Sequence, residues 1–302
     1  MMDYTSIDQL NQLWIHIDGA YATNTIRAYR SDMEEFINYC LPRKVTPLPA
    51  NPIDIANFLL AVSKNSIKSS TIRRKVASIS AVHRLSYLED PTKHPEVKLC
   101  IRKINRQLGN RFDQAYPINR NILNQMLAEC GSDLRGARNQ ALLLLAYDSM
   151  RRRSEIVSLR IEDLEFNASG GCSVLLRKSK TDQFCSGQWI HLKQETTNAI
   201  KKWLQHANMT NGFIFRSIHV NNSIGNEIDA SQINRIFKSL ATRAHLEKDI
   251  VDSISGHSMR VGAAQDLLVQ GASLPQIMVK GGWMKTDTVI RYIDKVRSPM
   301  LT

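Results

Sequence analysis

The stretch YDSMRRRSEIVSLR, residues 147–160, lies where a strongly apolar segment gives way to a run of arginines. Helical periodicity predicts a helix over residues 134–150 that ends inside this stretch. Arg152 lies three residues before Glu155, which on a helix places both side chains on adjacent turns of one face. Because Arg151, Arg152 and Arg153 are consecutive, more than one of them could bind an anion. Taken alone, the Arg152–Glu155 pair also fits an ordinary surface ion pair.

The clearest β-forming signal follows this stretch. Residues 172–176 and 188–192 are short β-prone segments on either side of a polar connection, residues 177–187. They predict a small antiparallel sheet or hairpin in an otherwise helical second half. Lys180 would lie near the tip of this hairpin, from where a long side chain can reach a bound ligand. A single lysine in a turn is more often simply solvated.

Two further motifs follow toward the carboxyl end. In SGHSMRVGAA, residues 255–264, His257 and Arg260 are three residues apart at a predicted helix start. Helix N-termini present free N–H groups that suit a phosphate. The second motif is GGW, which ends at Trp283, and Tyr292 follows nine residues later. Core packing is the commoner use of such aromatic residues, so neither motif alone decides a function.

The first part of the chain predicts helices only, five in number. The fourth predicted helix covers residues 71–86 and the fifth opens at Thr92 and ends near Leu108. Each has a basic face that could enter a DNA groove and reach flanking phosphates, although a charged helix face is usually just solvated. The predicted DNA contacts are Lys68, Arg73, Arg74, Lys75 and Arg84 with the fourth helix, and Arg102, Lys103 and Arg106 on the fifth.

The charge balance supports a polyanionic partner. Lys and Arg minus Asp and Glu give 40 − 28 = +12 for the whole chain. Residues 1–112 contribute 16 − 10 = +6 and the rest 24 − 18 = +6, so the excess is not confined to a tail. Cations that neutralise phosphates release condensed counterions, which makes nucleic acid the expected partner. The alternative is a basic protein with no polyanion.

Length and composition predict two domains. The chain has 302 residues, 43% of them hydrophobic, which is enough for a core in each domain. The polar segment GNRFDQAYP is the expected linker, so we predict a helical DNA-binding domain over residues 1–108, a linker over 109–117 and a catalytic domain over 118–302. The longest apolar run is residues 141–147, far below the ~20 residues that span a membrane, so no membrane partner is expected.

The number and spacing of the cysteines and histidines indicate the cellular compartment and whether a metal is expected. The five cysteines are scattered and odd in number, which favours reduced thiols and a cytoplasmic location. No histidine or cysteine array has metal-ligand spacing, and neither a P-loop nor an acidic metal-binding cluster is apparent. We therefore expect no metal and no cofactor.

Taken together, the order Arg152, Lys180, His257-x-x-Arg260, Trp283, Tyr292 resembles the tyrosine recombinase (phage integrase) family, closest to its Cre-like branch. The likeness covers residues 126–292 well, with Trp283 where many relatives have a histidine. The helical first half resembles the family's core-binding domain. The resemblance implies a two-domain, mainly α C-shaped DNA clamp with a small antiparallel sheet in the C-terminal domain.

The resemblance also implies a role for each motif residue. Tyr292 would attack a DNA phosphodiester to form a 3′-phosphotyrosyl bond, and Lys180 would protonate the leaving 5′-oxygen. Arg152 and Arg260 would clamp the non-bridging oxygens of the phosphate. The remaining implied roles are hydrogen bonds to that phosphate from His257 and Trp283, support of the cationic groups by Glu155, and contact with the DNA backbone by Arg151.

The chemistry of these residue types agrees with this implication. Two guanidinium groups match the charge that builds up on the equatorial oxygens of a phosphate under attack. A phenol with an ordinary pKa near 10 needs a cationic surrounding or a base, and the poor alkoxide leaving group needs an acid. The covalent intermediate conserves bond energy, so strands can be rejoined without ATP or metal.

Competing functions share much of this pattern. A type IB topoisomerase or a telomere resolvase uses the same chemistry, and a catalytically inactive sequence-specific DNA-binding protein would keep the fold. The resemblance implies a double-stranded DNA target site, a dimer on that site and a tetramer in the synaptic complex. It also implies action in the cytoplasm in association with the nucleoid. The chain ends ten residues after Tyr292, in a segment that contains Pro299, shorter than the tail through which relatives contact a neighbouring protomer.

Overall fold

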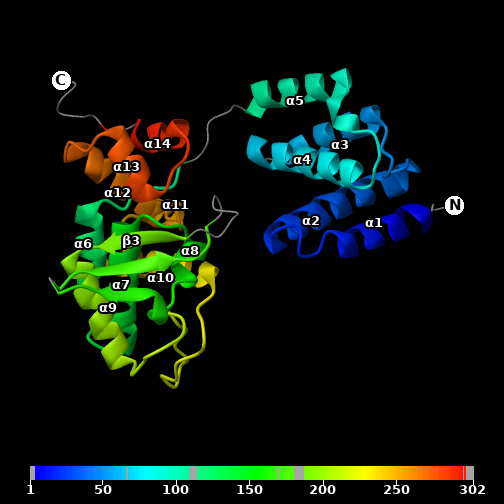
Figure 1. The fold of residues 1–302 in the computed structure, drawn as a ribbon. Helices are drawn as coiled ribbons and strands as arrows, with labels where there is room; N and C mark the ends of the chain where they lie inside the picture. The colour runs from blue at the N-terminus through cyan, green and yellow to red at the C-terminus, as the bar shows by residue number, and fades with distance from the viewer. Residues whose placement is uncertain are drawn as a thin grey trace. The chain divides into compact units, whose positions relative to one another are not determined.

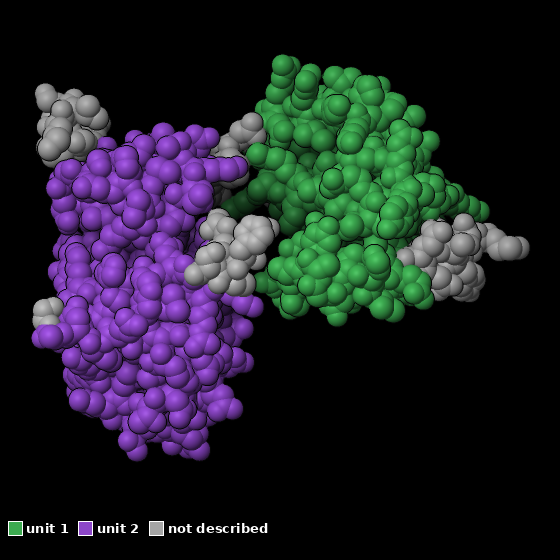
Figure 2. All heavy atoms as spheres, in the orientation of Figure 1, with its two compact units in different colours: residues 1–112 green, residues 113–302 purple. Residues whose placement is uncertain are grey.

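The computed structural model describes residues 4–65, 67–108, 114–168, 170–179, 187–294 and 296. The chain divides into two compact units, Met1–Phe112 and Asp113–Thr302, which Figure 2 shows in green and purple. Each unit encloses its own hydrophobic core. Helices dominate both, and three short antiparallel strands lie in the second unit (Figure 1). The predicted mainly α fold with a small antiparallel sheet is confirmed.

The first unit is built of helices around a core that includes Phe36 and Phe58. Its helices are α1 (Tyr4–His16), α2 (Thr23–Cys40), α3 (Pro52–Ser63), α4 (Ser69–Leu85) and α5 (Pro95–Leu108). The Asn51 side chain caps α3 by accepting a hydrogen bond from the Ile53 N–H at 2.9 Å. Helix α5 begins at Pro95 rather than Thr92. Pro95 holds His94 in an extended conformation, which keeps the helix from running through it.

Lys75 does not lie on the exposed basic face, so this part of the predicted DNA-contact set is wrong. Its side chain is only 3% exposed and points from α4 toward α2. The Nζ atom forms ion pairs with Asp32 at 3.3 Å and with Glu35 at 2.5 Å. Because Lys75 lies three residues after Ile72 and four before Ile79, it belongs to the buried side of α4.

The second unit contains the sheet and the remaining helices. Its first helices are α6 (Arg120–Ala128), α7 (Leu134–Ser149) and α8 (Arg153–Val157). The strands are β1 (Leu164–Phe166), β2 (Cys172–Leu176) and β3 (Gln188–Leu192). The later helices are α9 (Gln194–His206), α10 (Ala230–Arg243), α11 (Lys248–Ser253), α12 (Ser258–Val269), α13 (Leu274–Gly281) and α14 (Thr286–Ile293).

The sheet has the order β1-β2-β3, with both pairings antiparallel. Val174 lies opposite Leu164 on one side and Ile190 on the other, so the predicted pairing of β2 with β3 is confirmed. Val174 and Ile190 are buried on the core face of the sheet. Strand β1 and helices α8 and α11 were not anticipated, because three to six residues are too few to show a periodicity.

Two helices position the carboxyl-terminal motifs. Helix α7 is buried along most of its length and contacts α9, β3 and α12. Helix α12 contacts α7, α13 and α14, so the motif at its start lies in the same layer as the helix that carries Tyr292. The four-residue run Val261–Ala264 is small or branched and fully buried, and a Cβ on Gly262 would meet the Ile118 carbonyl oxygen at 1.9 Å. Glycine is therefore required there for close packing.

Candidate active site

Arg152 and Glu155 form a bonded pair at the start of α8. The carboxylate of Glu155, 4% exposed, accepts the Arg152 backbone N–H at 2.9 Å and its Nη1 at 2.7 Å. Helix α7 ends just before this pair, at Met150, whose left-handed backbone (φ 53°) turns the chain into α8. Because Arg152 stays partly exposed, its remaining guanidinium donors are available to an external acceptor.

Arg151 lies in the interior of the unit, so the prediction that it faces outward toward the DNA backbone is wrong. It is 5% exposed, and its Nη1 donates to Gln188 Oε1 at 3.0 Å while Nη2 donates to the Lys280 carbonyl at 3.2 Å. It thereby joins β3 to α13. Gly282 has a positive φ of 65°, and a Cβ there would meet Arg151 Nη1 at 2.2 Å, so glycine is needed on both counts. Burial lowers the pKa of Arg151.

Arg260 on α12 is buried with neutral partners. Its side chain is 1% exposed, and its Nη1 donates to the Met150 carbonyl while Nη2 donates to the Gly281 carbonyl at 3.2 Å. Burial is the main cause that lowers the pKa of Arg260 to about 10, and the positive charge of Arg152 is the second. The charges of Glu155 and Tyr292 act in the opposite direction, so all four groups lie within electrostatic range of one another.

Trp283 connects Arg260 to Tyr292. The Arg260 Cζ lies 4.6 Å from the centroid of the Trp283 ring. The Trp283 and Tyr292 rings meet edge to face, with centroids 5.6 Å apart and planes at 69°. Trp283 is buried, whereas Tyr292 on α14 is only half-buried. The structure therefore gathers Arg152, Glu155, Arg260, Trp283 and Tyr292 into one cluster.

Two glutamines that the sequence analysis missed hold the backbone of Tyr292. The Tyr292 carbonyl lies in the last turn of α14, where helix carbonyls lack partners in their own helix. It accepts Nε2 of Gln265, from α12, at 2.9 Å and Nε2 of Gln114 at 3.2 Å. A lone glutamine carries no sequence signal for such a contact, since its partner lies far along the chain.

His257 lies at the start of α12 and is exposed. It occupies the N-cap position, one turn before Arg260, and its backbone N–H donates to Ser255 Oγ at 3.2 Å. Ser258 Oγ accepts the Ser255 N–H at 2.9 Å, and neither serine side chain caps the helix. Lys180 lies outside the described residues.

The exposed basic residues predicted to contact DNA lie in the first unit. Lys68, Arg73, Arg74 and Arg84 are exposed at or along α4, and Arg102, Lys103 and Arg106 are exposed along α5. The Arg74 Nη1 also donates to Asp32 at 2.8 Å, so part of its charge is already compensated.

Among the described residues, no three His, Cys, Asp or Glu side chains are grouped as metal ligands would be. No described helix is both long and apolar enough to span a membrane.

Both halves of the chain match known families. Residues 118–298 match the Phage integrase family, and residues 10–90 match the Phage integrase N-terminal SAM-like domain. Recombinase cre of Escherichia phage P1 is 27% identical over 297 residues, covering 92% of this chain and 86% of that protein. An integrase/recombinase xerD homolog of Selenomonas ruminantium is 30% identical over 291 residues, covering 92% of this chain and 84% of that protein.

Solved structures share the fold. The integrase of transposon Tn1549 in complex with transposon right-end DNA superposes with a TM-score of 0.67 at 14% identity, covering 93% of each chain. The XerH site-specific recombinase in a post-cleavage complex with its difH substrate gives a TM-score of 0.66 at 17% identity, covering 90% of this chain and 76% of that one. Together with the family matches over both halves, this shows that the chain belongs to the phage integrase family of tyrosine recombinases.

Proposed function

We propose that the protein is a site-specific DNA recombinase that cleaves and rejoins DNA strands through a covalent 3′-phosphotyrosine intermediate. The observation that carries this proposal is the contact chain from Arg260 through Trp283 to Tyr292. Arg260 is buried against carbonyl oxygens and an indole, and no described carboxylate hydrogen-bonds to it. A phosphate placed beside Tyr292 would supply the missing negative charge.

The proposed reaction is a transesterification. The Tyr292 phenol passes its proton to a base or to solvent and its oxygen attacks phosphorus, so that a tyrosyl P–O bond forms as the bond from phosphorus to the 5′-oxygen breaks. Lys180 gives the leaving 5′-oxygen a proton. Arg152 and Arg260 hold the non-bridging oxygens, where charge builds up in the transition state. His257 and Trp283 donate further hydrogen bonds to the same phosphate.

Rejoining reverses these steps. A 5′-hydroxyl gives its proton to Lys180 and attacks the phosphotyrosyl phosphorus. The new phosphodiester forms as the tyrosyl P–O bond breaks, and the Tyr292 oxygen takes back a proton from a base or from solvent. Each step exchanges one phosphate ester for another of similar energy, so the strand exchange needs no cofactor. Glu155 acts as a positioning residue in this scheme, because its carboxylate holds both the backbone and the guanidinium of Arg152.

Gln265 and Gln114 act as positioning residues for the nucleophile. Both donate to the carbonyl of Tyr292, and Gln265 thereby ties the end of α14 to α12, which carries Arg260. Attack on phosphorus requires the reacting atoms to be held ~3–3.5 Å apart in line. Fixing the backbone of Tyr292 narrows the range of positions that its phenol oxygen can take.

The DNA-binding part of the proposal extends to the whole chain. We propose a helical DNA-binding domain over residues 1–108, a linker over 109–117 and a catalytic domain over 118–302, closing around duplex DNA as a C-shaped clamp. The exposed cations of α4 and α5 would contact the duplex. A dimer on each site and a tetramer in the synaptic complex complete the assembly, and the reaction takes place in the cytoplasm at the nucleoid. Its support is the family membership and the basic character of both halves.

A nicked suicide duplex tests the proposed function. The target site is first selected from random duplex DNA with Tyr292→Phe protein, which should bind without cleaving. The unmodified chain should then form a covalent protein–DNA adduct on the nicked site, and Tyr292→Phe should form none. Tyr87→Phe removes the hydroxyl of an exposed tyrosine in the first unit and should leave the adduct unchanged. Tight site-specific binding without any adduct would instead identify a DNA-binding protein that lacks catalysis.

A further inference from the structure

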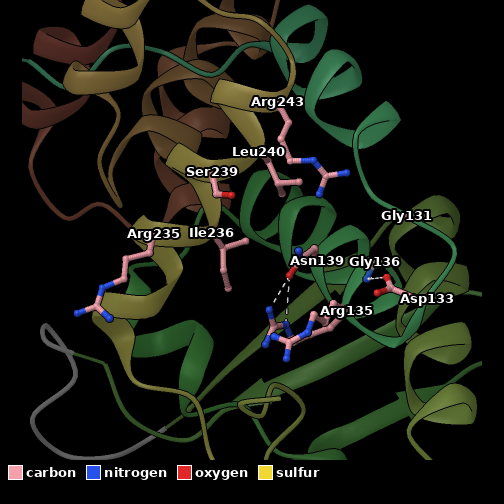
Figure 3. A pocket seen from close by; sticks show the side chains of 11 residues that line it. Gly131, Asp133, Arg135, Gly136, Asn139, Arg235, Ile236, Ser239, Leu240 and Arg243 are labelled. Carbon is pink, nitrogen blue, oxygen red and sulfur yellow. Dashed lines mark hydrogen bonds between the residues drawn. The ribbon is translucent and has the colours of Figure 1, made fainter. Parts of the chain in front are cut away.

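A second cationic pocket lies in unit 2, away from the residues around Tyr292. It has a volume of about 460 Å³ and lies between the first turns of α7 and one side of α10 (Figure 3). Arg135 and Arg138 come from α7, and Arg235 and Arg243 come from α10. None of the residues that form the candidate active site lines it.

The positive charge of this pocket is largely uncompensated. Among its described lining residues, Asp133 is the sole carboxylate, and its Oδ1 accepts the Gly136 N–H at 2.8 Å as the cap of α7. Arg243 has an ion pair with Glu129 at 3.7 Å, a long contact at the edge of the pocket. Figure 3 shows Arg235 extending away from the other labelled arginines. Arg135 Nη2 donates to the neutral His219 carbonyl at 2.5 Å. Arg135, Arg138 and Arg243 thus bring three positive charges to the pocket, against the capping carboxylate of Asp133 and the more distant Glu129 at its edge.

Arg138 is the one buried arginine among the described residues of the pocket. Its side chain is 6% exposed, and Nε and Nη2 both donate to Asn139 Oδ1, at 3.2 and 2.9 Å. Its Nη1 makes a long contact, 3.4 Å, with the Arg216 carbonyl. All of these acceptors are neutral. Burial, and next the charge of Arg135, lower the pKa of Arg138 to about 10. A buried cation without an anion is costly, and a bound anion would remove that cost.

The chemistry of the lining selects the type of anion. Guanidinium groups bind phosphate oxygens through paired donors, and the α7 N-terminus adds a partial positive charge. The volume is larger than a carboxylate needs and has room for a phosphate with its attached sugar. Ile236 and Leu240 give the α10 side an apolar wall suited to the carbon atoms of such a group.

We propose that this pocket binds a second phosphate group, a backbone phosphate of the bound DNA distinct from the one that is cleaved. The choice of DNA as the source rests on the proposed function, whereas the phosphate chemistry rests on the pocket alone. The pocket would anchor the duplex to the catalytic unit without taking part in bond breakage. A free phosphorylated molecule is the other source of the same chemistry.

The test compares two doubly substituted full-length proteins. In R135Q/R243Q two pocket cations are neutralised at partly or fully exposed positions, which spares the buried Arg138. The control K202Q/K248Q removes two exposed charges of the same unit that lie outside the pocket. The binding constant for the selected duplex is measured from 50 to 300 mM salt. Each lost phosphate contact should reduce the log–log slope by ~0.9.

We expect R135Q/R243Q to reduce the slope by about one unit and to weaken binding about tenfold at low salt, with the control nearly unchanged. In a second arm, pyrophosphate without DNA is added during thermal unfolding. Protection of the unmodified protein but not of R135Q/R243Q, with an unchanged slope, would retain the phosphate site and assign it to a free ligand. No change of slope and no protection would overturn the proposal. Failure of the unmodified protein to bind DNA would instead refute the proposed function, and the pyrophosphate arm would still decide on the pocket.

Discussion

The two units bury positive charge in opposite ways. In unit 1, Lys75 lies between the carboxylates of Asp32 and Glu35, and the charge is neutralised inside the fold. In unit 2, Arg260 and Arg151 are equally buried but donate to carbonyl and amide oxygens. A paired buried cation contributes to the architecture. A buried cation with neutral partners favours any anion that can reach it, and of these two arginines Arg260 is the one that contacts the Trp283 ring beside Tyr292.

The pKa values of the unit 2 arginines reflect this difference. Burial lowers the pKa of Arg260 to about 10 and also lowers that of Arg151, which means that their surroundings disfavour the charged form. A bound phosphate would act in the opposite direction. The folded enzyme thus keeps these arginines in a state that substrate binding makes more favourable, at the expense of stability without substrate.

Arg260→Met gives the largest expected effect in this comparison. Loss of a guanidinium that faces the developing charge should slow adduct formation on the nicked duplex by about 10²–10³-fold or more. The free energy of unfolding at neutral pH should change little, because removal of a desolvated charge offsets the loss of the hydrogen bonds to the Met150 and Gly281 carbonyls. Single-turnover cleavage and urea denaturation measure the two quantities. A large loss of stability would show that Arg260 is mainly structural.

Lys75→Met should have the opposite effects, with a loss of stability and no loss of cleavage rate. It leaves Asp32 buried with Arg74 and Ser78 as its remaining partners, so the free energy of unfolding should fall by about 3 kcal/mol. Once folded, the protein should cleave at the rate of the unmodified chain. Urea denaturation followed by adduct formation at low temperature tests this. Slow cleavage by fully folded Lys75→Met would break the distinction between the two units.

Gln265→Leu should have a smaller effect, confined to the chemical step. Without the amide donor the Tyr292 carbonyl keeps only Gln114, and the nucleophile samples a wider range of positions. We expect a roughly tenfold slower cleavage at saturating DNA with unchanged affinity, within the range that misplacement of a reacting group costs. Gln270→Leu changes an exposed glutamine at the end of the same helix and serves as the control. Equal losses in both variants would contradict a positioning role.

Arg106→Gln should give the smallest change. Arg106 is exposed on α5, and removal of one phosphate contact should lower affinity a few-fold and reduce the salt slope by ~0.9. Arg27→Gln, an exposed arginine on α2 that was not predicted to touch DNA, should leave the slope unchanged. Binding titrations at several salt concentrations separate the two. Identical slopes for Arg106→Gln and the unmodified protein would remove α5 from the DNA-contact surface.

Most helices and strands could be predicted from local sequence patterns. The residues of the candidate active site could be predicted only from the order of all their motifs along the chain. The pairing of β2 with β3 joins segments that are close along the chain, so the sequence was sufficient to predict it. Lys75 was misplaced because its charge outweighed its helical spacing, although its position between Ile72 and Ile79 indicated burial.

Other features had no local signal at all. The interior position of Arg151 depends on Gln188 and Lys280, which the chain brings near only after folding. The same holds for the two glutamines on Tyr292 and for the arginines of the pocket between α7 and α10. Long-range side-chain contacts of this kind require the assembled tertiary structure, since no periodicity or spacing encodes them.

The left-handed backbone at Met150 links the positions of two arginines of the candidate active site. Its carbonyl accepts Arg260, and Arg152 follows two residues later, so two arginines from distant parts of the chain share one peptide as their common reference. Glycine would adopt this backbone at lower cost but would leave the peptide freer to rotate. Methionine at this position therefore restricts the peptide that accepts Arg260 and leads into Arg152.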